Sequence, residues 1–276
     1  MAKVFNEVLG RNVDVPDEPR RIVSFSPAIT ESLFLLGMGD SVAGVSAFCS
    51  RPPEARSKRK VGSYNTVSLE LLRQISPDLI FTVTGYQRDF ALRLSEEFPV
   101  YPIELPVSIS GIIDMVVKVG LVVGRYDNVR RLEASLAASL SSLKSPRSKV
   151  KGYVEIDLGG PVSFGAHSYI TDALNILGVS TPFDGVREEW VKPDFGAVAR
   201  FDPEIFIYEA KMYSSFPPDG LERLIGERGW SGLSFAKAGN YFLAPGPLDF
   251  LAHHGPSFVT EALPWLSQRV MAVASR

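Results

Sequence analysis

The amino-acid sequence contains one structural layout twice, and this repeat constrains the fold more than any other feature. Residues 68–81 and 194–207 each have the pattern of a short helix, a proline turn and an apolar strand. A second pair of segments, residues 29–37 and 170–178, shares an Ile-Thr start, an acidic third residue and a Leu-Gly end. Two repeats this far apart predict two similar α/β lobes with a cleft between them.

Short apolar runs alternate with helical patterns along both halves of the chain. Strands are expected near residues 21–26, 41–46, 79–83, 100–103, 150–156, 204–208 and 241–243. Helices are expected near residues 30–36, 69–75, 88–98, 112–123, 171–177, 221–226 and 257–270. This alternation favours two Rossmann-like α/β lobes with parallel sheets, whose binding loops lie at the carboxyl ends of the strands.

The segment between the halves is expected to be helical. Apolar residues recur every three or four positions between residues 129 and 143, and no glycine or proline intervenes before Pro146. Residues 127–145 are therefore predicted to form one unbroken helix of ~28 Å at 1.5 Å per residue. The expected organisation is an N-terminal lobe (1–126), an interlobe helix (127–146) and a C-terminal lobe (147–276). A stiff connection of this kind permits only slight rocking of the lobes.

Composition excludes several classes of protein. The 276 residues carry a net charge of −2, and the basic run at residues 51–60 is more typical of a solvated loop than of a nucleic-acid site. No stretch approaches the ~20 apolar residues of a membrane span. Residues 1–12 lack the pattern of a signal peptide, so either a leader has been removed or the protein is intracellular. The single cysteine, Cys49, rules out an internal disulfide.

Catalytic motifs are absent from the sequence. Three histidines and one cysteine leave little material for nucleophilic catalysis. The chain has no Gly-x-Ser-x-Gly elbow, P-loop, dinucleotide-binding glycine motif or His-Glu-x-x-His motif. The sequence therefore predicts a binding protein, with no enzymatic activity, no cofactor and no metal site of its own.

Several short motifs resemble a known family along residues 10–270. They are Arg-Ile-Val-Ser at 21–24, Thr-Glu at 30–31 before Leu-Gly at 36–37, Val-Gly at 61–62 and Pro-Asp-Leu-Ile at 77–80. Together with a single interlobe helix, they resemble the substrate-binding proteins of ABC importers for cobalamin, haem and ferric siderophores. The loop at residues 48–55 resembles that of the cobalamin members. The resemblance implies a monomer that captures a bulky metal chelate outside the cytoplasm and delivers it to a membrane permease.

The resemblance also implies two acidic docking residues, one on each lobe, for arginine pockets of the permease. Glu70 stands at the first position. A carboxylate in a first helical turn also suits the helix dipole, so this residue has a purely structural explanation as well. On the second lobe Gly196 stands where glutamate is expected, and Asp194 is the nearest acid. Either Asp194 substitutes, or docking is asymmetric, or the protein docks to no permease.

Candidate ligand-binding residues lie on the loops expected to face the cleft. Tyr64 and Trp190 match family positions where aromatic side chains contact the ligand, and Arg51 and Arg88 could meet carboxylates or phosphate. One of the two adjacent histidines could coordinate a metal complex, although an ordinary polar contact is favoured. The full set is Phe48, Arg51, Tyr64, Asn65, Tyr86 and Arg88 in the first lobe, with Ser168, Tyr169, Trp190, Tyr208, Lys211, His253 and His254 in the second.

The identity of the ligand stays open among three candidates. The loop at residues 48–55 favours cobalamin or another corrinoid, and a ferric siderophore or haem is the alternative. A different class also fits, namely a cytosolic corrinoid- or haem-binding module with no importer. The lack of a leader pattern in residues 1–12 and the glycine at position 196, where the docking glutamate is expected, both favour that class.

Overall fold

The computed structural model describes residues 1–275, apart from the side chain of Tyr86, which was a predicted ligand contact and lies outside the described part. The chain divides into two compact units. The first unit contains Met1–Pro106 and Ser110–Ala138, and the second contains Val107–Ile109 and Ser139–Arg276. Each unit is built around its own sheet.

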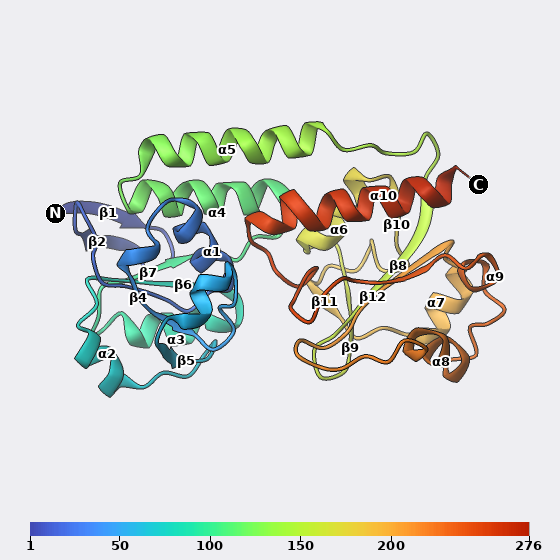
Figure 1. The fold of residues 1–276 in the computed structure, drawn as a ribbon, viewed down its shortest axis with the longest axis horizontal. Helices are drawn as coiled ribbons and strands as arrows, with labels where there is room; N and C mark the ends of the chain where they lie inside the picture. The colour runs from blue at the N-terminus through green and yellow to red at the C-terminus, as the bar shows by residue number, and fades with distance from the viewer. Residues whose placement is uncertain (276) are drawn as a thin grey trace. The chain divides into compact units, whose positions relative to one another are not determined.

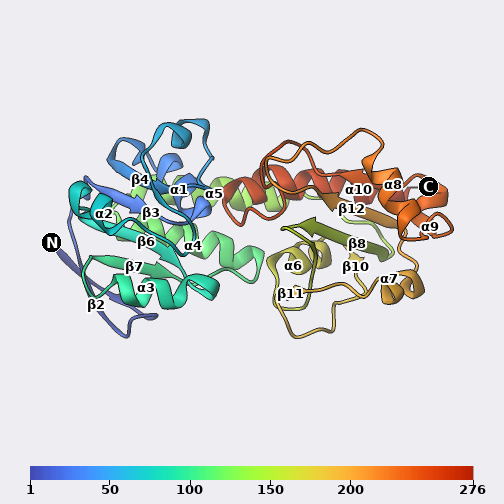
Figure 2. The same cartoon turned by 90° about the horizontal axis from the view of Figure 1, so that it is seen from below.

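The first unit combines an N-terminal hairpin with a five-stranded parallel sheet (Figure 1). The strands are β1 Ala2–Asn6, β2 Arg11–Val15, β3 Ile22–Ser24, β4 Val42–Ser46, β5 Lys60–Gly62, β6 Leu79–Val83 and β7 Val100–Ile103. The sheet has the order β5-β4-β3-β6-β7, and Figure 2 shows β4, β3, β6 and β7 side by side in that order. The helices are α1 Pro27–Leu35, α2 Leu69–Ile75, α3 Arg88–Leu94, α4 Ile109–Val122 and α5 Tyr126–Ser141.

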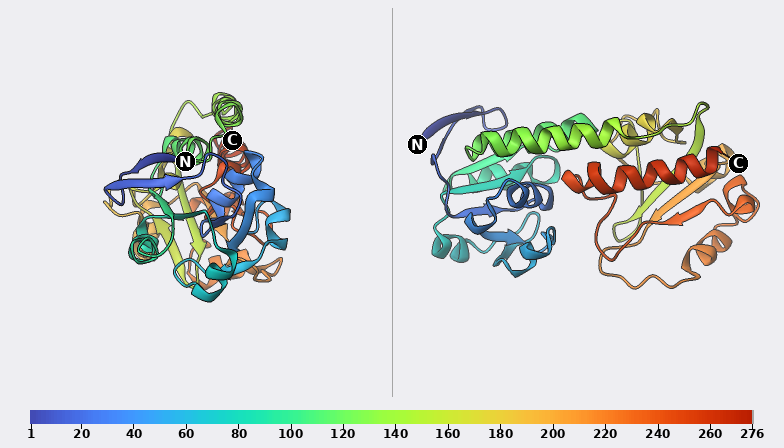
Figure 3. Two further views of the ribbon diagram at one scale, coloured as in Figure 1. Left: turned by 90° about the vertical axis from the view of Figure 1, so that its left-hand side faces the viewer. Right: turned by 45° about the horizontal axis from the view of Figure 1, so that its top comes forward.

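Helix α5 contains the boundary between the two units, which falls after Ala138. In the first unit it packs along α4 (Figure 3), where Gly120 leaves room for the side chain of Val129. The helix ends at Ser141, four residues before the predicted end. One local hydrogen bond and one from a residue distant in sequence accompany the early end. The Ser142 hydroxyl donates to the Ser139 carbonyl, and Ser267 donates to the carbonyl of Lys144 at 2.7 Å.

The second unit has a six-stranded mixed sheet. The strands are β8 Val150–Asp157, β9 Pro161–Phe164, β10 Val179–Ser180, β11 Trp190–Val191, β12 Ile205–Glu209 and β13 Tyr241–Leu243. β8, β12 and β13 are parallel as expected, and the short β10, which was not predicted, is parallel to β8. β9, which was not predicted either, returns antiparallel to β8 and pairs with β11. The helices are α6 Tyr169–Ile176, α7 Phe195–Phe201, α8 Gly220–Glu227, α9 Ser234–Ala238 and α10 Leu263–Ala274, the last preceded by a π-helical turn, Phe258–Ala262.

The internal repeat has the same backbone in both units. α2 and α7 are each seven residues long and are capped by side-chain oxygens of Ser68 and Asp194. Each helix ends at a residue in the left-handed region, Ser76 (φ 50°) and Asp202 (φ 51°). A proline and then a buried strand follow in each copy. The repeat predicted from the sequence is therefore present in the structure as the same helix–turn–strand unit in both halves of the chain.

The strand of each copy is joined to the neighbouring central strand by equivalent bonds. In the first unit the Asp78 carboxylate accepts the Arg21 amide (3.0 Å), and the Arg21 side chain donates to Ser76 (2.6 Å). In the second unit the Glu204 carboxylate accepts the Lys151 amide (2.8 Å), and the Lys151 side chain donates to the Phe201 carbonyl (3.1 Å). In each unit these two bonds hold the strand of the repeat in register beside the central strand of its sheet.

The two cores differ in composition. The first unit is largely aliphatic around Phe25 and Phe90, whose rings meet edge to face at 5.1 Å. The second unit has an aromatic cluster in which Tyr153, Phe206 and Trp230 contact one another at 5.5–5.9 Å. Aromatic rings of this size bury large apolar areas, so this cluster holds β8 and β12 firmly under the loops that follow them.

Candidate functional site: a polar cavity in the second unit

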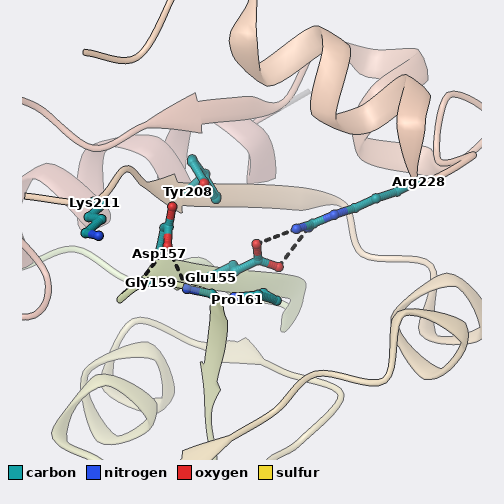
Figure 4. A pocket seen from close by; sticks show the side chains of 8 residues that line it. Glu155, Asp157, Gly159, Pro161, Tyr208, Lys211 and Arg228 are labelled. Atoms are coloured by element: carbon teal, nitrogen blue, oxygen red, sulfur yellow. Dashed lines mark hydrogen bonds and ion pairs between the residues drawn. The ribbon is translucent and has the colours of Figure 1, made fainter. Parts of the chain in front are cut away.

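A cavity of about 360 Å³ lies at the carboxyl ends of β8 and β12, entirely within the second unit (Figure 4). We call it the β8–β12 cavity. Parallel strands direct their carboxyl ends and loops to the same edge of the sheet, which is the usual position of a ligand site in α/β proteins. Its lining residues are Glu155, Asp157, Gly159, Gly160, Pro161, Tyr208, Lys211 and Arg228.

Asp157 is fixed by the turn that follows β8. Its Oδ1 atom accepts the amides of Gly159 (2.8 Å) and Gly160 (2.9 Å), which closes a tight Asx turn into β9. Gly159 has φ +100°, a conformation that side chains rarely adopt, so glycine is required there. The other carboxylate oxygen, Oδ2, has no hydrogen-bond partner among the described residues. The turn therefore presents one fixed acceptor atom.

Glu155 and Arg228 form a buried ion pair in the lining. The guanidinium donates two bonds to the carboxylate, at 2.6 and 2.8 Å, and the two side chains are 11% and 1% exposed. The Tyr153 hydroxyl donates to the same carboxylate at 2.5 Å, and the guanidinium lies 4.2 Å from the Phe195 ring centroid. Bidentate pairing and stacking satisfy both charges internally, so this pair contributes shape and rigidity but no net charge.

Tyr208 and Lys211 complete the polar lining. Burial, and then the charges of Asp157 and Glu155, raise the pKa of Tyr208 to about 12, so its phenol stays protonated at neutral pH. Lys211 is exposed, and its ammonium forms no ion pair within the described part of the chain. Figure 4 shows the Lys211 and Asp157 side chains on the same side of the cavity. Both Tyr208 and Lys211 were predicted ligand contacts.

The turn after β12 holds a strained aromatic residue that the sequence did not reveal. The Ser214 amide donates to the Lys211 carbonyl (2.9 Å), and between them Tyr213 has φ +62°. A bulky side chain in the left-handed region costs ~1–2 kcal/mol relative to glycine. Tyr213 is nevertheless 63% exposed, and its amide is held by the Pro247 carbonyl at 2.8 Å. An exposed ring kept at this cost next to a cavity is a candidate ligand contact.

The predicted histidines lie inside the second unit. His253 and His254 are 5% and 9% exposed, and burial lowers the pKa of His254 to about 3, with the neighbouring His253 charge as the next cause. The imidazole of His254 is therefore neutral, and its Nε2 atom has no partner among the described residues. A ligand could reach these rings only after the surrounding loop opened.

A carboxylate anchors that loop to the end of β12. Glu209, which is 3% exposed, accepts the amides of Phe250 (3.1 Å), Leu251 and Ala252 (3.5 Å). The hydroxyl of Tyr169, another predicted ligand contact, donates to the Leu251 carbonyl at 2.7 Å and is buried with its ring. Burial, above all, raises the pKa of Glu209 to about 7. Tyr169 therefore has a structural partner in the loop.

The other predicted second-unit residues occupy different settings. Trp190 is 43% exposed on β11, where it pairs with Phe164 of β9. Ser168 is buried and caps α6 by accepting the Ile170 amide. The indole of Trp190 is thus partly exposed to solvent, whereas Ser168 completes a helix end.

In the first unit two of the predicted residues form an aromatic pair. The rings of Phe48 and Tyr64 stack at 4.3 Å with an interplanar angle of 11°, and both side chains are half-buried. Arg51 is also half-buried, while Asn65 and Arg88 are exposed. The stacked pair provides a flat apolar surface of the kind that large planar ligands contact.

The two predicted docking acids are not equivalent in the structure. Glu70 is exposed in the first turn of α2, and its carboxylate accepts a long bond from Gln74, at 3.4 Å. Asp194 caps α7 by accepting the Gly196 amide (2.8 Å), and its other oxygen pairs with Arg200 at 3.5 Å. In the repeat, Asp194 therefore matches Ser68, and Gly196 matches Glu70.

No helix among the described residues is both long and apolar enough to cross a membrane. No group of three or more His, Cys, Asp or Glu side chains among them is arranged to hold a metal ion.

Comparison with known proteins gives matches over both short and long stretches. The chain is 39% identical over 62 residues to the vitamin B12-binding protein of Pectobacterium carotovorum, a match that spans 22% of each protein. It therefore aligns with about a fifth of the length of that relative. It is 21% identical over 268 residues to an uncharacterised ABC transporter substrate-binding lipoprotein of Bacillus subtilis, covering 92% of this chain and 81% of the lipoprotein.

Solved structures share the fold. The periplasmic vitamin B12 binding protein of Vibrio cholerae superposes with a TM-score of 0.73 at 16% identity, covering 94% of this chain and 99% of that one. A periplasmic heme-binding protein of Roseiflexus superposes with a TM-score of 0.73 at 20% identity, covering 92% and 99%. These likenesses confirm the predicted two-lobe α/β class.

The family model described as periplasmic binding protein matches residues 22–248, which include both sheets. The resemblance inferred from the short sequence motifs is thus confirmed, and the chain belongs to the periplasmic binding protein family.

Proposed function

We propose that this protein is the extracytoplasmic solute-binding component of an ABC importer and that its ligand is a corrinoid such as cobalamin. The family match over residues 22–248 carries the importer role, and the long alignment with a Bacillus substrate-binding lipoprotein supports it. The 39% identity with a vitamin B12-binding protein over 62 residues supports the corrinoid.

The proposed mechanism is binding without turnover. The ligand contacts the loops at the carboxyl ends of the strands in each unit, as the internal repeat predicts. In the second unit the β8–β12 cavity contributes Asp157 and Lys211, and the strained Tyr213 and exposed Trp190 contribute aromatic surface. The fixed Asx turn and the buried Glu155–Arg228 pair mean that this part of the site exists before the ligand arrives, which lowers the cost of binding.

The first unit contributes a flat surface and a docking residue to the proposal. The stacked rings of Phe48 and Tyr64 suit the face of a macrocycle, with Arg51, Asn65 and Arg88 available for its polar groups. Glu70 docks the loaded protein to the permease. Asp194, whose carboxylate already caps α7 and pairs with Arg200, makes a weaker second contact, so the proposed docking is asymmetric.

Haem is the second candidate ligand, and one observation favours it. His254 is neutral, and its Nε2 lone pair has no partner among the described residues, so an opened 249–254 loop would offer an imidazole ligand to iron. This route requires the bonds from Glu209 and Tyr169 to that loop to break. The corrinoid remains the first choice because it requires no such opening.

Titration of the purified protein with cyanocobalamin, haem and a ferric hydroxamate siderophore, followed by absorbance, tests the proposal. We expect saturable one-to-one binding of cyanocobalamin and weaker binding of the other two. Saturation by haem with a histidine-ligated spectrum would transfer the proposal to haem. Binding of none of the three would contradict a metal-chelate ligand altogether.

A further inference from the structure

The β8–β12 cavity contains two opposite charges that do not neutralise each other. Asp157 and Lys211 both line it, yet no ion pair joins them among the described residues. The remaining charged groups of the lining, Glu155 and Arg228, are already paired at 2.6 Å. The cavity is therefore neutral overall, with one separate anion and one separate cation available to a ligand.

The backbone fixes the positions from which both side chains extend. The Asp157 carboxylate is held by the amides of Gly159 and Gly160, which its Oδ1 atom accepts at 2.8 and 2.9 Å. The Lys211 carbonyl is held by the amide and the hydroxyl of Ser214, which fixes the turn from which the ammonium extends. The aspartate is consequently an acceptor in a fixed place, and the lysine is a donor attached to a fixed turn.

We propose that the β8–β12 cavity recognises a carboxamide group of the ligand. The amide N–H₂ donates to Asp157 Oδ2, and the amide carbonyl accepts from Lys211 Nζ. This inference rests on the proposed solute-binding function and deepens it, because it names the chemical group that the second unit reads.

A carboxamide suits this pair better than a charged group does. A ligand carboxylate would accept a bond from Lys211, but its negative charge would lie close to that of Asp157. Repulsion between these two like charges would weaken the binding of a carboxylate ligand. A ligand ammonium would be repelled by Lys211 in the same way. The Tyr208 phenol, which stays protonated, adds a donor for a carbonyl. Corrinoids carry several carboxamide side chains, whereas haem carries two carboxylates.

The test compares matched ligands that differ only in this group. Calorimetry would measure the affinity for dicyano-cobyrinic acid heptaamide and for the corresponding heptacarboxylate, and for haem and its bis-amide. The wild-type protein is expected to prefer the amide by at least about tenfold. Asp157→Asn keeps the Oδ1 acceptor of the turn but removes the charge, so this preference should fall to about twofold. Lys237→Gln, at an exposed lysine outside the cavity, serves as the control and should keep the wild-type preference.

Failure of carboxamide recognition can be distinguished from failure of the proposed solute-binding function. Equal affinity for amide and carboxylate, or a preference unchanged in Asp157→Asn, would overturn carboxamide recognition while leaving solute binding intact. Binding of haem in preference to its bis-amide would also overturn it. Binding of neither ligand pair would overturn both the inference and the proposed ligand class.

Discussion

The two copies of the helix–turn–strand repeat, α2–β6 and α7–β12, share a skeleton but differ in chemistry at the surface. Different residues perform the same structural tasks in each. Ser68 and Asp194 cap the helices, and Ser76 and Asp202 end them at φ 50° and 51°. The two copies therefore share their backbone geometry, and different side chains support that geometry in each copy.

The exposed and functional positions of the copies have diverged. Glu70 on α2 corresponds to Gly196 on α7, and the apolar end of β6 at Val83 corresponds to Glu209 at the end of β12. The loop after β6 is held by a neutral amide, since the Gln87 side chain accepts the Val83 amide at 3.0 Å. The loop held by β12 depends on a carboxylate instead. The proposed docking residue thus lies in the first unit, and the buried carboxyl group with a raised pKa lies in the second.

Removal of Glu70 is expected to have the largest effect. Glu70→Ala should weaken binding to the permease by about 30-fold or more, because loss of one partner from an interface ion pair costs ~2–5 kcal/mol. Ligand affinity should be unchanged, since Glu70 lies on an exposed helix outside the proposed ligand loops. The measurement is binding of the loaded protein to its permease in nanodiscs, with Glu96→Ala, another exposed acid of the first unit, as control. Equal permease affinity for Glu70→Ala and wild type would remove the docking role.

The pH dependence of stability should come from the second unit. The pKa of Glu209 is raised to about 7, so the folded state holds its proton more tightly than the unfolded chain does. The resulting stabilisation is complete below the unfolded pKa of ~4.5 and disappears as the pH rises through about 7. Between pH 5 and 8 the free energy of unfolding should fall by about 2 kcal/mol more in the wild type than in Glu209→Gln.

Urea denaturation at several pH values measures this difference. Gln87→Ala, which breaks the neutral counterpart in the first unit, should lower stability by the same amount at each pH. A pH dependence that persists undiminished in Glu209→Gln would place the responsible group elsewhere.

Tyr213 is expected to lower the stability of the folded protein and to increase its affinity for the ligand. Tyr213→Gly removes a side chain from the left-handed region, so the free energy of unfolding should rise by up to about 1 kcal/mol. Corrinoid affinity should fall by about fivefold or more through loss of the exposed ring. Tyr213→Phe keeps both the ring and the strain and should match the wild type in both respects. Corrinoid affinity that survives in Tyr213→Gly would show that the ring does not contact the ligand.

Gly196→Glu, which copies Glu70 into the second unit, should have the smallest effect. A Cβ added at Gly196 would lie 3.1 Å from the capping Oδ1 atom of Asp194 and 3.2 Å from the guanidinium of Arg200, with no backbone atom among these close contacts. Replacing a helical glycine near the N-terminus should add about 0.5–1 kcal/mol to the free energy of unfolding. Thermal denaturation measures that gain, and the nanodisc assay shows whether a second glutamate strengthens docking. A loss of stability would contradict the matched geometry of the two helices.

Much of the fold could be predicted from the sequence because local signals agreed with the tertiary structure. The bounds of α2, β6, β7 and β13 coincide with those predicted, since a cap or a proline marks their ends. The end of α5 could not be predicted because it depends on Ser267, which is distant in sequence. The antiparallel return of β9 was signalled by the Gly159–Gly160 pair, a turn cue that the parallel pattern obscured.

The candidate site was less predictable than the fold. Tyr208 and Lys211 could be predicted as candidate site residues because Tyr208 lies near the end of a recognisable strand and Lys211 follows that strand. Asp157 gave no distinct signal, since an aspartate after a strand is common in turns. Tyr213 gave none either, because tyrosine does not mark a left-handed residue. The His254 imidazole lies 6.0 Å from the ring of Tyr169, which in turn packs edge to face against Phe258, and no local pattern encodes these contacts.

The most direct test of the account is amide hydrogen exchange with and without cyanocobalamin. If the ligand occupies the β8–β12 cavity, exchange should slow at residues 158–160 and 211–214 of the second unit when the protein is saturated. Glu70 and the rest of α2 should exchange at the same rate in both states. Unchanged exchange at both cavity segments in the saturated protein would contradict the central claim that this cavity contacts the ligand.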